Sequence, residues 1–255
     1  MTLHDQALKC ADLILNSHCT AVVSGAGMST AAGIPDFRGP KGIYKRADVE
    51  ADRLFDIGWF RRDPSYYYRF HRECVNMLAG IEPTFTHKFL ARLEDDDLLQ
   101  GIVTQNFDGL HEAAGSKNVY TIHGTIRKAY CTSCGEYYGY EAVNRLLETA
   151  DVPRCTRCGG VIKPDIVFFG ENVKYLDQCQ RLCSRAELLF VLGSSLNVYP
   201  AALLPQMCSG SIVVVNRGEV SSDYLHPSRI ALRVDDDLDA FFKEVDTILI
   251  EKKKR

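Results

Sequence analysis

Five short runs along the chain are continuously apolar, whereas a strand with one solvated face would alternate apolar and polar residues. Apolar residues with helical spacing precede or separate them, most clearly at residues 3–16, 87–94 and 175–186. Strands covered on both faces and alternating with helices are typical of a parallel sheet. The sequence therefore predicts an α/β fold with a Rossmann-like parallel core, whose strands are Thr20–Ser24, Gly101–Thr104, Val119–Ile122, Leu188–Leu192 and Ile212–Val215.

Two regions interrupt this alternation of strands and helices. Residues 39–86 are rich in aromatic residues and have a helical pattern, and residues 128–164 hold two cysteine pairs. We interpret both as insertions that together form a smaller domain, made of a helical module and a metal-binding ribbon. The Rossmann-like domain would then comprise residues 1–38, 87–127 and 165–255.

Composition and charge narrow the range of functions. Of the 255 residues, 46% are hydrophobic and 25% are charged, as in ordinary globular proteins, and the formal net charge is -3. No apolar run approaches the roughly 18 residues that a membrane span needs, and the first residues lack the pattern of a signal peptide. We therefore expect a cytoplasmic protein with neither a membrane nor a nucleic acid as partner. The basic run at residues 251–255 is interpreted as a solvated end.

A small or polar cluster follows each of the five predicted strands. Parallel strands present their carboxyl ends at one edge of a sheet, and the ligands of open α/β sheets bind there. Five clusters at such an edge are stronger evidence for a ligand site than any one of them alone. They are Gly25–Gly27, Gln105–Asp108, His123–Gly124, Gly193–Ser195 and Asn216.

The first cluster opens the glycine-rich stretch Gly25–Gly33. Glycines at a strand-to-helix turn let the backbone approach a pyrophosphate, although a merely structural tight turn has the same composition. Thr30 occupies the third glycine position of a dinucleotide-binding fingerprint, and no acidic residue follows a second strand to hold a ribose, which argues against an ordinary dehydrogenase. Downstream, Arg38 has the fork geometry for a phosphate or for a surface ion pair. Phe37 beside it offers a flat apolar face.

The polar side chains of Gln105, Asn106 and Asp108 directly follow a buried strand. Such residues either cap the next helix or face a ligand, and capping is the simpler interpretation for Asp108 taken alone. Its two polar neighbours favour a ligand. His123 ends another strand of the same predicted sheet, which makes it a candidate general base as well as a candidate structural histidine.

Four of the ten cysteines form two tight pairs. The pairs, Cys131 with Cys134 and Cys155 with Cys158, have the spacing of a zinc ribbon, in which two knuckles close one tetrahedral site. Four thiolates complete the coordination sphere and leave no position for water, so we expect one structural zinc ion and not a catalytic one. The other six cysteines are expected to pack as small apolar side chains in a reducing compartment.

These segments, in this order, resemble the sirtuin family of NAD⁺-dependent deacylases. The likeness extends over residues 5–245 and is carried by the two cysteine pairs and by the motifs GAGMSTAAGIPDFRGPKGIY, TQNFDGLHEAAG, HG, KPDIVFFGE, GSSLNVYPAALLP and VVN. Gly42–Tyr44 and the run at residues 167–172 are most similar to the bacterial and archaeal subgroup often called class U.

The resemblance implies a role for each matching position. NAD⁺ would be bound by the glycine loop, the strand ends and a region near the start of the C-terminal segment: Gly25, Ala26, Gly27, Thr30, Phe37, Arg38, Gln105, Asn106, Asp108, Gly193, Ser194, Ser195, Asn216 and Leu238. Asn106 and Asp108 would lie in the nicotinamide pocket. The tunnel for the acyl-lysine side chain would be lined by Phe37, His123, Val167 and Phe169. An acetylated peptide would add a strand between Gly170–Glu171 and Asn197–Val198.

The implied activity is NAD⁺-dependent removal of an acetyl group from the lysines of proteins or peptides. Burial of the nicotinamide favours its departure, and the amide oxygen of the acyl-lysine then attacks C1′ of the ribose. His123 would act as the general base on the ribose hydroxyls, and Asn106 would be the second catalytic residue. The products would be nicotinamide, O-acetyl-ADP-ribose and free lysine.

Two positions depart from patterns found in the family. Phe107 stands where isoleucine is usual beside the nicotinamide site, so inhibition by nicotinamide and affinity for NAD⁺ are expected to differ. Sirtuins that remove succinyl or malonyl groups carry a Tyr-x-x-Arg pair on the small domain. With Tyr68 in register, the second position here is His71, so we expect acetyl and other uncharged acyl groups as substrates.

Two other functions remain open at this level. A mono-ADP-ribosyltransferase would use the same site with another acceptor, although it has less need of a base such as His123. An inactive zinc-ribbon binding module, for instance a nucleic-acid adaptor, would need a basic ribbon. The basic residues beside the knuckles are offset by Glu136 and Glu141, and the net charge of -3 also opposes this alternative.

Overall fold

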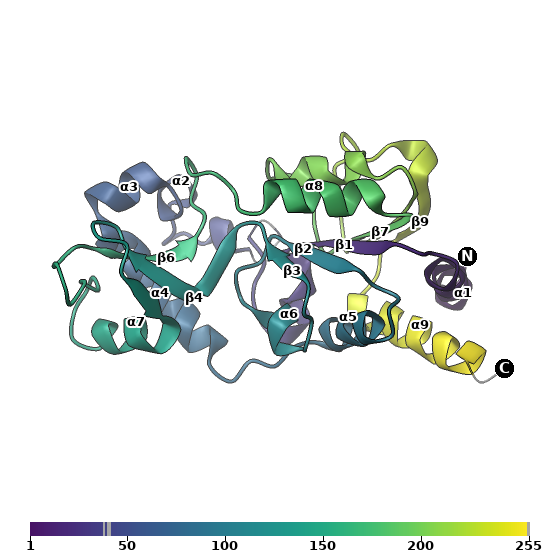
Figure 1. Cartoon of the computed structure of the whole chain (residues 1–255), viewed down its shortest axis with the longest axis horizontal. Coiled ribbons are helices and arrows are strands. Elements are labelled where there is room, and N and C mark those ends of the chain that lie inside the picture. Colours follow the sequence, from purple (N-terminus) through teal and green to yellow (C-terminus); the bar gives the residue numbers. More distant parts are fainter. Residues whose placement is uncertain (38, 40–41, 254–255) are drawn as a thin grey trace.

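The computed structural model describes residues 1–37, 39 and 42–253. Its central sheet has six parallel strands in the order β3-β2-β1-β7-β8-β9 (Figure 1). The order reverses between β1 and β7, which makes this the switch point where ligands of such sheets bind. The strands are β1 (Thr20–Ser24), β2 (Gly101–Thr104), β3 (Val119–Thr121), β7 (Leu188–Leu192), β8 (Ser211–Val215) and β9 (Ile230–Val234).

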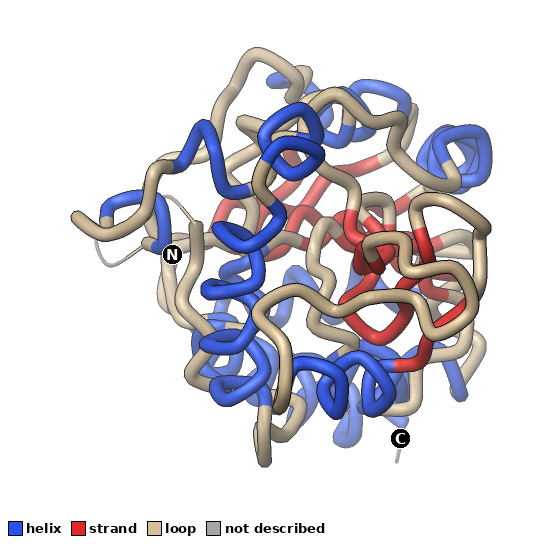
Figure 2. Tube along the Cα trace, turned by 90° about the vertical axis from the view of Figure 1, so that its left-hand side faces the viewer, coloured by secondary structure: helices blue, strands red, loops and turns tan. Residues whose placement is uncertain are grey.

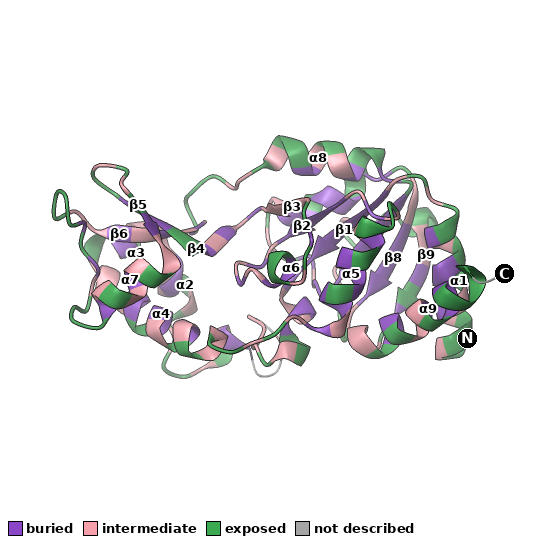
Figure 3. Cartoon of the chain, turned by 60° about the horizontal axis from the view of Figure 1, so that its bottom comes forward, coloured by how far each residue is buried: buried purple, intermediate pink, exposed green. Residues whose placement is uncertain are grey.

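Helices cover both faces of this sheet, as the continuously apolar strands require. Within β1, Val22 packs into one hydrophobic cluster while its neighbours Ala21 and Val23 pack into the cluster on the opposite face. The first face is covered by α1 (Leu3–Leu15), α5 (Phe85–Asp95) and α9 (Leu238–Lys253), and the second by α8 (Leu176–Arg185) and the 3₁₀ helix Ala201–Met207. Buried strands therefore run between two helical layers (Figure 3). The predicted Rossmann-like core is confirmed.

The two insertions meet in a second, smaller unit at the other end of the molecule (Figure 2, which faces this end). An antiparallel sheet of order β5-β4-β6 consists of β4 (Gly124–Cys131), β5 (Tyr137–Gly139) and β6 (Ile162–Ile166), and α7 (Tyr140–Leu147) packs on β4. The helical module supplies α2 (Ala51–Leu54), α3 (Ile57–Arg62) and α4 (Pro64–Leu78). Phe168, which follows β6, contacts Phe55, Phe60 and Tyr67 of the module in one buried aromatic cluster. One core thus joins the ribbon to the helical module.

Two segments differ in detail from the sequence prediction. The glycine-rich stretch after β1, interpreted as a strand-to-helix turn, leads into two short 3₁₀ helices, Ala26–Met28 and Thr30–Ala32. Of the basic run, residues 251–253 are described; they are exposed, as expected, but they form the last turn of α9. There Lys252 pairs with Asp12 of α1 and Lys253 with Asp96 after α5. Within the described ranges, no helix combines the length and apolarity that crossing a membrane would require.

Candidate active site

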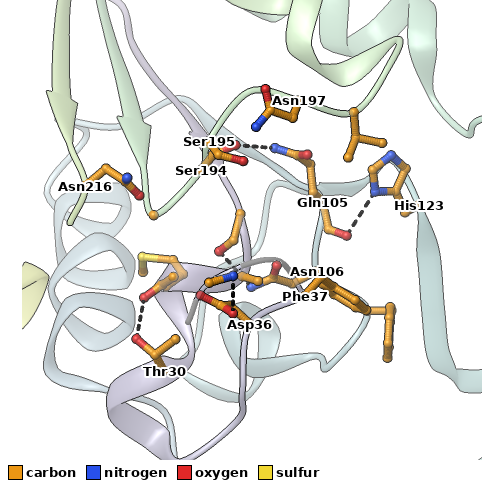
Figure 4. Close-up of a pocket in the computed structure, with 18 of the residues that line it drawn as sticks. Thr30, Asp36, Phe37, Gln105, Asn106, His123, Ser194, Ser195, Asn197 and Asn216 are labelled. Atoms are coloured by element: carbon orange, nitrogen blue, oxygen red, sulfur yellow. Dashed lines mark hydrogen bonds between the residues drawn. The ribbon is translucent and has the colours of Figure 1, made fainter. Parts of the chain in front are cut away.

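A cavity of about 930 Å³ opens at the carboxyl ends of β1, β2, β7 and β8 and reaches the segment that follows β6 (Figure 4). This volume is typical of small-molecule sites. The predicted positions that line it are Gly25, Ala26, Gly27, Thr30, Phe37, Gln105, Asn106, His123, Val167, Phe169, Gly170, Glu171, Gly193, Ser194, Ser195, Asn197, Val198, Asn216 and Leu238. Asp108 lines a second, smaller pocket of about 40 Å³ next to it. Arg38 lies outside the described residues.

The glycines after β1 are explained first by contact with the loop after β7. The N–H of Gly27 donates to the carbonyl of Gly193 at 2.8 Å, and the N–H of Gly25 donates to the carbonyl of Leu192 at 2.9 Å. A Cβ on Gly27 would lie 2.7 Å from the Cα of Gly193, which itself has a φ of 56°. Any side chain here would push the two loops apart. Close packing against the backbone of Gly193 therefore explains the glycines of this loop. The loop also lines the cavity.

Amide side chains at the end of β2 connect the three loops at the switch point. Asn106 donates through Nδ2 to the carbonyl of Gly25 at 3.1 Å and to Oγ of Ser29 at 3.2 Å. Gln105 donates through Nε2 to Oγ of Ser194 at 2.9 Å (Figure 4). Both side chains face the cavity and also fix its walls, so they hold the loops after β1, β2 and β7 in one arrangement.

Asp108 contacts the start of the next helix and also lines a pocket. Its Oδ1 accepts the N–H of Leu110, the first residue of α6 (Leu110–Ala113), at 2.9 Å. Its Oδ2 accepts the hydroxyl of Ser29 at 2.7 Å. The side chain is buried and lines the small pocket together with Asn106 and Phe107. A capping carboxylate is thus also placed where a ligand in the small pocket would meet it.

His123 has the orientation expected of a general base. Its Nδ1 lies 3.1 Å from the carbonyl oxygen of Gln105, and because a carbonyl only accepts, Nδ1 carries the hydrogen (Figure 4). In the neutral ring this leaves Nε2 with a free lone pair. Burial lowers the pKa of His123, and the hydrogen bond to Gln105 opposes that shift. The neutral form, which can take up a proton, is therefore the one favoured near neutral pH.

Several residues of this region were not predicted from the sequence. Phe55 lines the cavity and packs against Phe37 and Phe107, with each pair of rings 6.0 Å apart. It comes from the helical module, where no local signal distinguishes it from core. Asp36 also lines the cavity and accepts the N–H of Gly39 at 2.9 Å. Asp36 directly precedes Phe37, a predicted site residue, and this position in the sequence could have identified it.

The four paired cysteines lie together at the far end of the ribbon. Their sulfur atoms are all within 4.8 Å of one another, and the Cys131–Cys158 and Cys134–Cys155 distances are 3.5 and 3.6 Å. Four sulfurs at about 2.3 Å from one zinc ion would be separated by about 3.8 Å, so the arrangement fits the metal. The hydroxyl of Tyr138 donates to Cys155 at 3.2 Å and lowers the pKa of that thiol to about 6, which favours the thiolate that zinc requires.

The parallel sheet has a large cavity at its switch point, and the inserted ribbon brings together four cysteines that could hold a metal ion. These features define an α/β protein of the nucleotide-binding class. The model of the Sir2 family matches residues 25–200. This chain belongs to the Sir2 family, as the resemblance to sirtuins predicted.

Named relatives and solved structures agree with that assignment. The NAD-dependent protein deacetylase of Thermotoga maritima is 45% identical over 217 residues, which cover 83% of this chain and 87% of the relative. The enzyme of the same name from Sulfolobus acidocaldarius is 40% identical over 227 residues, or 88% of each chain. A Sir2 structure with a p53 peptide and NAD⁺ superposes with a TM-score of 0.85 at 39% identity, covering 97% of this chain and 98% of that one.

Proposed function

We infer that this chain is an NAD⁺-dependent protein-lysine deacetylase that releases nicotinamide, O-acetyl-ADP-ribose and free lysine. The observation that carries the inference is the lining of one cavity by the glycine loop, the strand-end amides and His123. Relatives named NAD-dependent protein deacetylases, and Sir2 structures holding a peptide with NAD⁺, support it. These comparisons do not favour the transferase or the inactive binding module.

The residues at the switch point would divide the work between binding and proton transfer. NAD⁺ supplies an electrophilic ribose carbon with a leaving group. The glycine loop, Ser194 and Asn216 would hold its phosphates and sugars, while Asn106 and Asp108 would hold the carboxamide beside the small pocket. His123 would receive a ribose hydroxyl proton at Nε2, because its Nδ1 is already bonded to the chain.

The acyl-lysine would enter between Gly170–Glu171 and Asn197–Val198, with Phe37, Val167 and Phe169 around its side chain. Features of α4 support a preference for uncharged acyl groups. The hydroxyl of Tyr68 donates to the carbonyl of Ile162, and Tyr68 and His71 are both buried in the small unit away from the cavity lining. Arg72 donates to the carbonyl of Ala150 at 2.6 Å, so it is not aimed at the site either.

We also propose the domain division and the location given by the sequence. The Rossmann-like domain would be residues 1–38, 87–127 and 165–255, and the small domain residues 39–86 and 128–164. Separate hydrophobic clusters in the two units support this division, although β4 and β6 cross its boundaries and so connect the domains. The protein would act in the cytoplasm, and one zinc ion would hold the ribbon.

Incubation of the purified protein with an acetyl-lysine peptide tests the proposed function. We expect mass spectrometry to show loss of the acetyl group only when NAD⁺ is present, together with O-acetyl-ADP-ribose. Transfer of ADP-ribose to peptide or protein without deacetylation would instead identify a transferase. Absence of any product with acetyl, succinyl and long-chain peptides would contradict an enzyme of this class.

Replacement of Phe107 by isoleucine is expected to strengthen inhibition by nicotinamide at least threefold. Phe107 lines both the cavity and the small pocket, and its ring packs on Phe37. A smaller side chain would enlarge a pocket of only about 40 Å³, and differences of one or two methylenes in such pockets change affinity by about 10-fold or more. The measurement is the nicotinamide concentration that halves deacetylation. Phe70→Ile is the matched control, since Phe70 contacts Phe55 but lines neither pocket. An unchanged value in Phe107→Ile would contradict the assignment.

A further inference from the structure

A partly buried ion pair closes the turn that follows β6. Nζ of Lys163 lies 2.9 Å from Oε2 of Glu171, and the two side chains are only 12% and 31% exposed. Lysine and glutamate are rarely buried without a partner, because transfer of a charge out of water is costly. The pair stands beside the cavity, whose lining includes Glu171, and its lysine is the least exposed cation among the ion pairs of the described residues.

Both members of the pair bind the backbone on either side of Val167. Nζ of Lys163 donates to the carbonyl of Ile166 at 2.7 Å, and Oε2 of Glu171 accepts the N–H of Phe168 at 2.8 Å. Lys163 also lies over the ring of Phe168, with its Nζ 4.1 Å from the centroid. Charge-assisted hydrogen bonds of this kind are stronger than neutral ones. The backbone around Val167 therefore has few alternative positions while the pair is intact.

The same segment is bound to the candidate base and to the helical module. The N–H of Val167 donates to the carbonyl of His123 at 2.8 Å. The N–H of Phe169 donates to the carbonyl of Phe55 at 2.6 Å. All three residues of this segment line the cavity, but Phe168 is buried in the aromatic cluster, whereas Val167 is half-buried and Phe169 is exposed. Any shift of the backbone would move these cavity-lining side chains relative to His123.

We propose that Lys163 and Glu171 are positioning residues that set the wall of the acyl-lysine tunnel and the edge to which the peptide adds. The proposal rests on the deacetylase function inferred above and deepens it. The ion pair holds the carboxylate of Glu171 toward Lys163. The backbone at Gly170–Glu171 is then the part of this segment that would contact the substrate. Burial lowers the pKa of Lys163, and the hydrogen bond and the charge of Glu171 oppose this shift.

Steady-state kinetics of Lys163→Met test the pair. Methionine keeps the length and apolar packing of lysine and removes the donors. We expect the KM for an acetyl-lysine peptide to rise roughly tenfold, while the KM for NAD⁺ stays within about twofold, because a misplaced wall weakens binding of one substrate only. Lys163→Arg should recover much of the loss. Lys117→Met, which breaks an exposed pair with Asp95 far from the cavity, should match the wild type.

Two further readouts separate the possible failures. Glu171→Gln keeps the shape of the pair and removes its charge, so it should raise the peptide KM in the same direction even if Lys163→Met does not fold. An unchanged peptide KM in either folded variant, or equal losses for peptide and NAD⁺ that follow a lowered Tm, would overturn the positioning role. If the wild type is active and the variants behave in either of these ways, only this inference is overturned. If the wild type has no deacetylase activity, the proposed function is overturned as well.

Discussion

Replacement of His123 by alanine is expected to lower kcat for deacetylation by a factor of about 10²–10⁴, the usual contribution of a general base. The imidazole is held with Nδ1 toward the carbonyl of Gln105, which leaves Nε2 for the substrate. Alanine removes the proton acceptor but leaves the glycine loop and the amides of Gln105 and Asn106 in place. Deacetylation can be measured by mass spectrometry of an acetyl-lysine peptide, and NAD⁺ binding by calorimetry.

The same variant should retain most of the earlier chemistry. Departure of nicotinamide precedes the step that needs the base, so exchange of labelled nicotinamide into NAD⁺ should fall by less than about tenfold. His4→Ala is the matched control, because His4 is an exposed histidine that pairs with Glu244 on α9. Full deacetylation by His123→Ala would show that another group accepts the proton. Equal loss of exchange and deacetylation would show that His123 only supports the fold.

Much of the fold was predictable because burial on both faces leaves a strong pattern in a strand. The runs at Thr20–Ser24, Gly101–Thr104 and Leu188–Leu192 were predicted with their observed bounds. Strand β9 was missed because it lies at the sheet edge, where Ile230 and Ala231 are only half-buried and Arg233 is exposed. The sequence predicted a helical module at residues 39–86 but not the bounds or the packing of its helices. Its aromatic residues mark a core, but only the fold brings Phe168 to Phe60.

The site could be predicted where several strand ends carried polar residues, because a parallel sheet brings those ends together. That argument needed only the order of the strands, and it correctly gathered Gln105, His123 and Ser194 around one cavity. It could not find Phe55, which reaches the cavity from the inserted module. Nor could it find the pairing of Lys163 with Glu171, since the seven intervening residues must first form a turn that brings the two side chains together. The sequence thus predicted residues at the ends of individual strands, but it did not predict contacts that form only when separate segments pack together.

The knuckles of the ribbon have little besides the metal to hold them. Cys131 and Cys155 are each followed, four residues on, by a glycine in the left-handed region, Gly135 with a φ of 72° and Gly159 with a φ of 74°. Both glycines donate to the carbonyl of the first cysteine of their own knuckle. Apart from the cysteines, of which Cys131 and Cys155 are buried, the two turns hold only polar residues and glycine, and metal binding in small zinc sites is worth about 10–16 kcal/mol. The ribbon is therefore expected to depend on zinc for its order.

Cys155→Ser, or treatment with a strong chelator, is accordingly expected to remove bound zinc and lower Tm by roughly 10 °C or more, since loss of a structural metal is among the most destabilising changes. Deacetylation should be lost as well, although the cysteines lie outside the cavity lining, because β4 joins the ribbon to His123 and β6 joins it to Val167. Atomic emission measures the bound zinc, thermal melting measures Tm, and mass spectrometry of an acetyl-lysine peptide measures deacetylation. Cys19→Ser is the matched control, as Cys19 lies apart from the cluster and should leave zinc and activity unchanged. Retention of full activity after the zinc is gone would show that the ribbon does not order the substrate-binding segment.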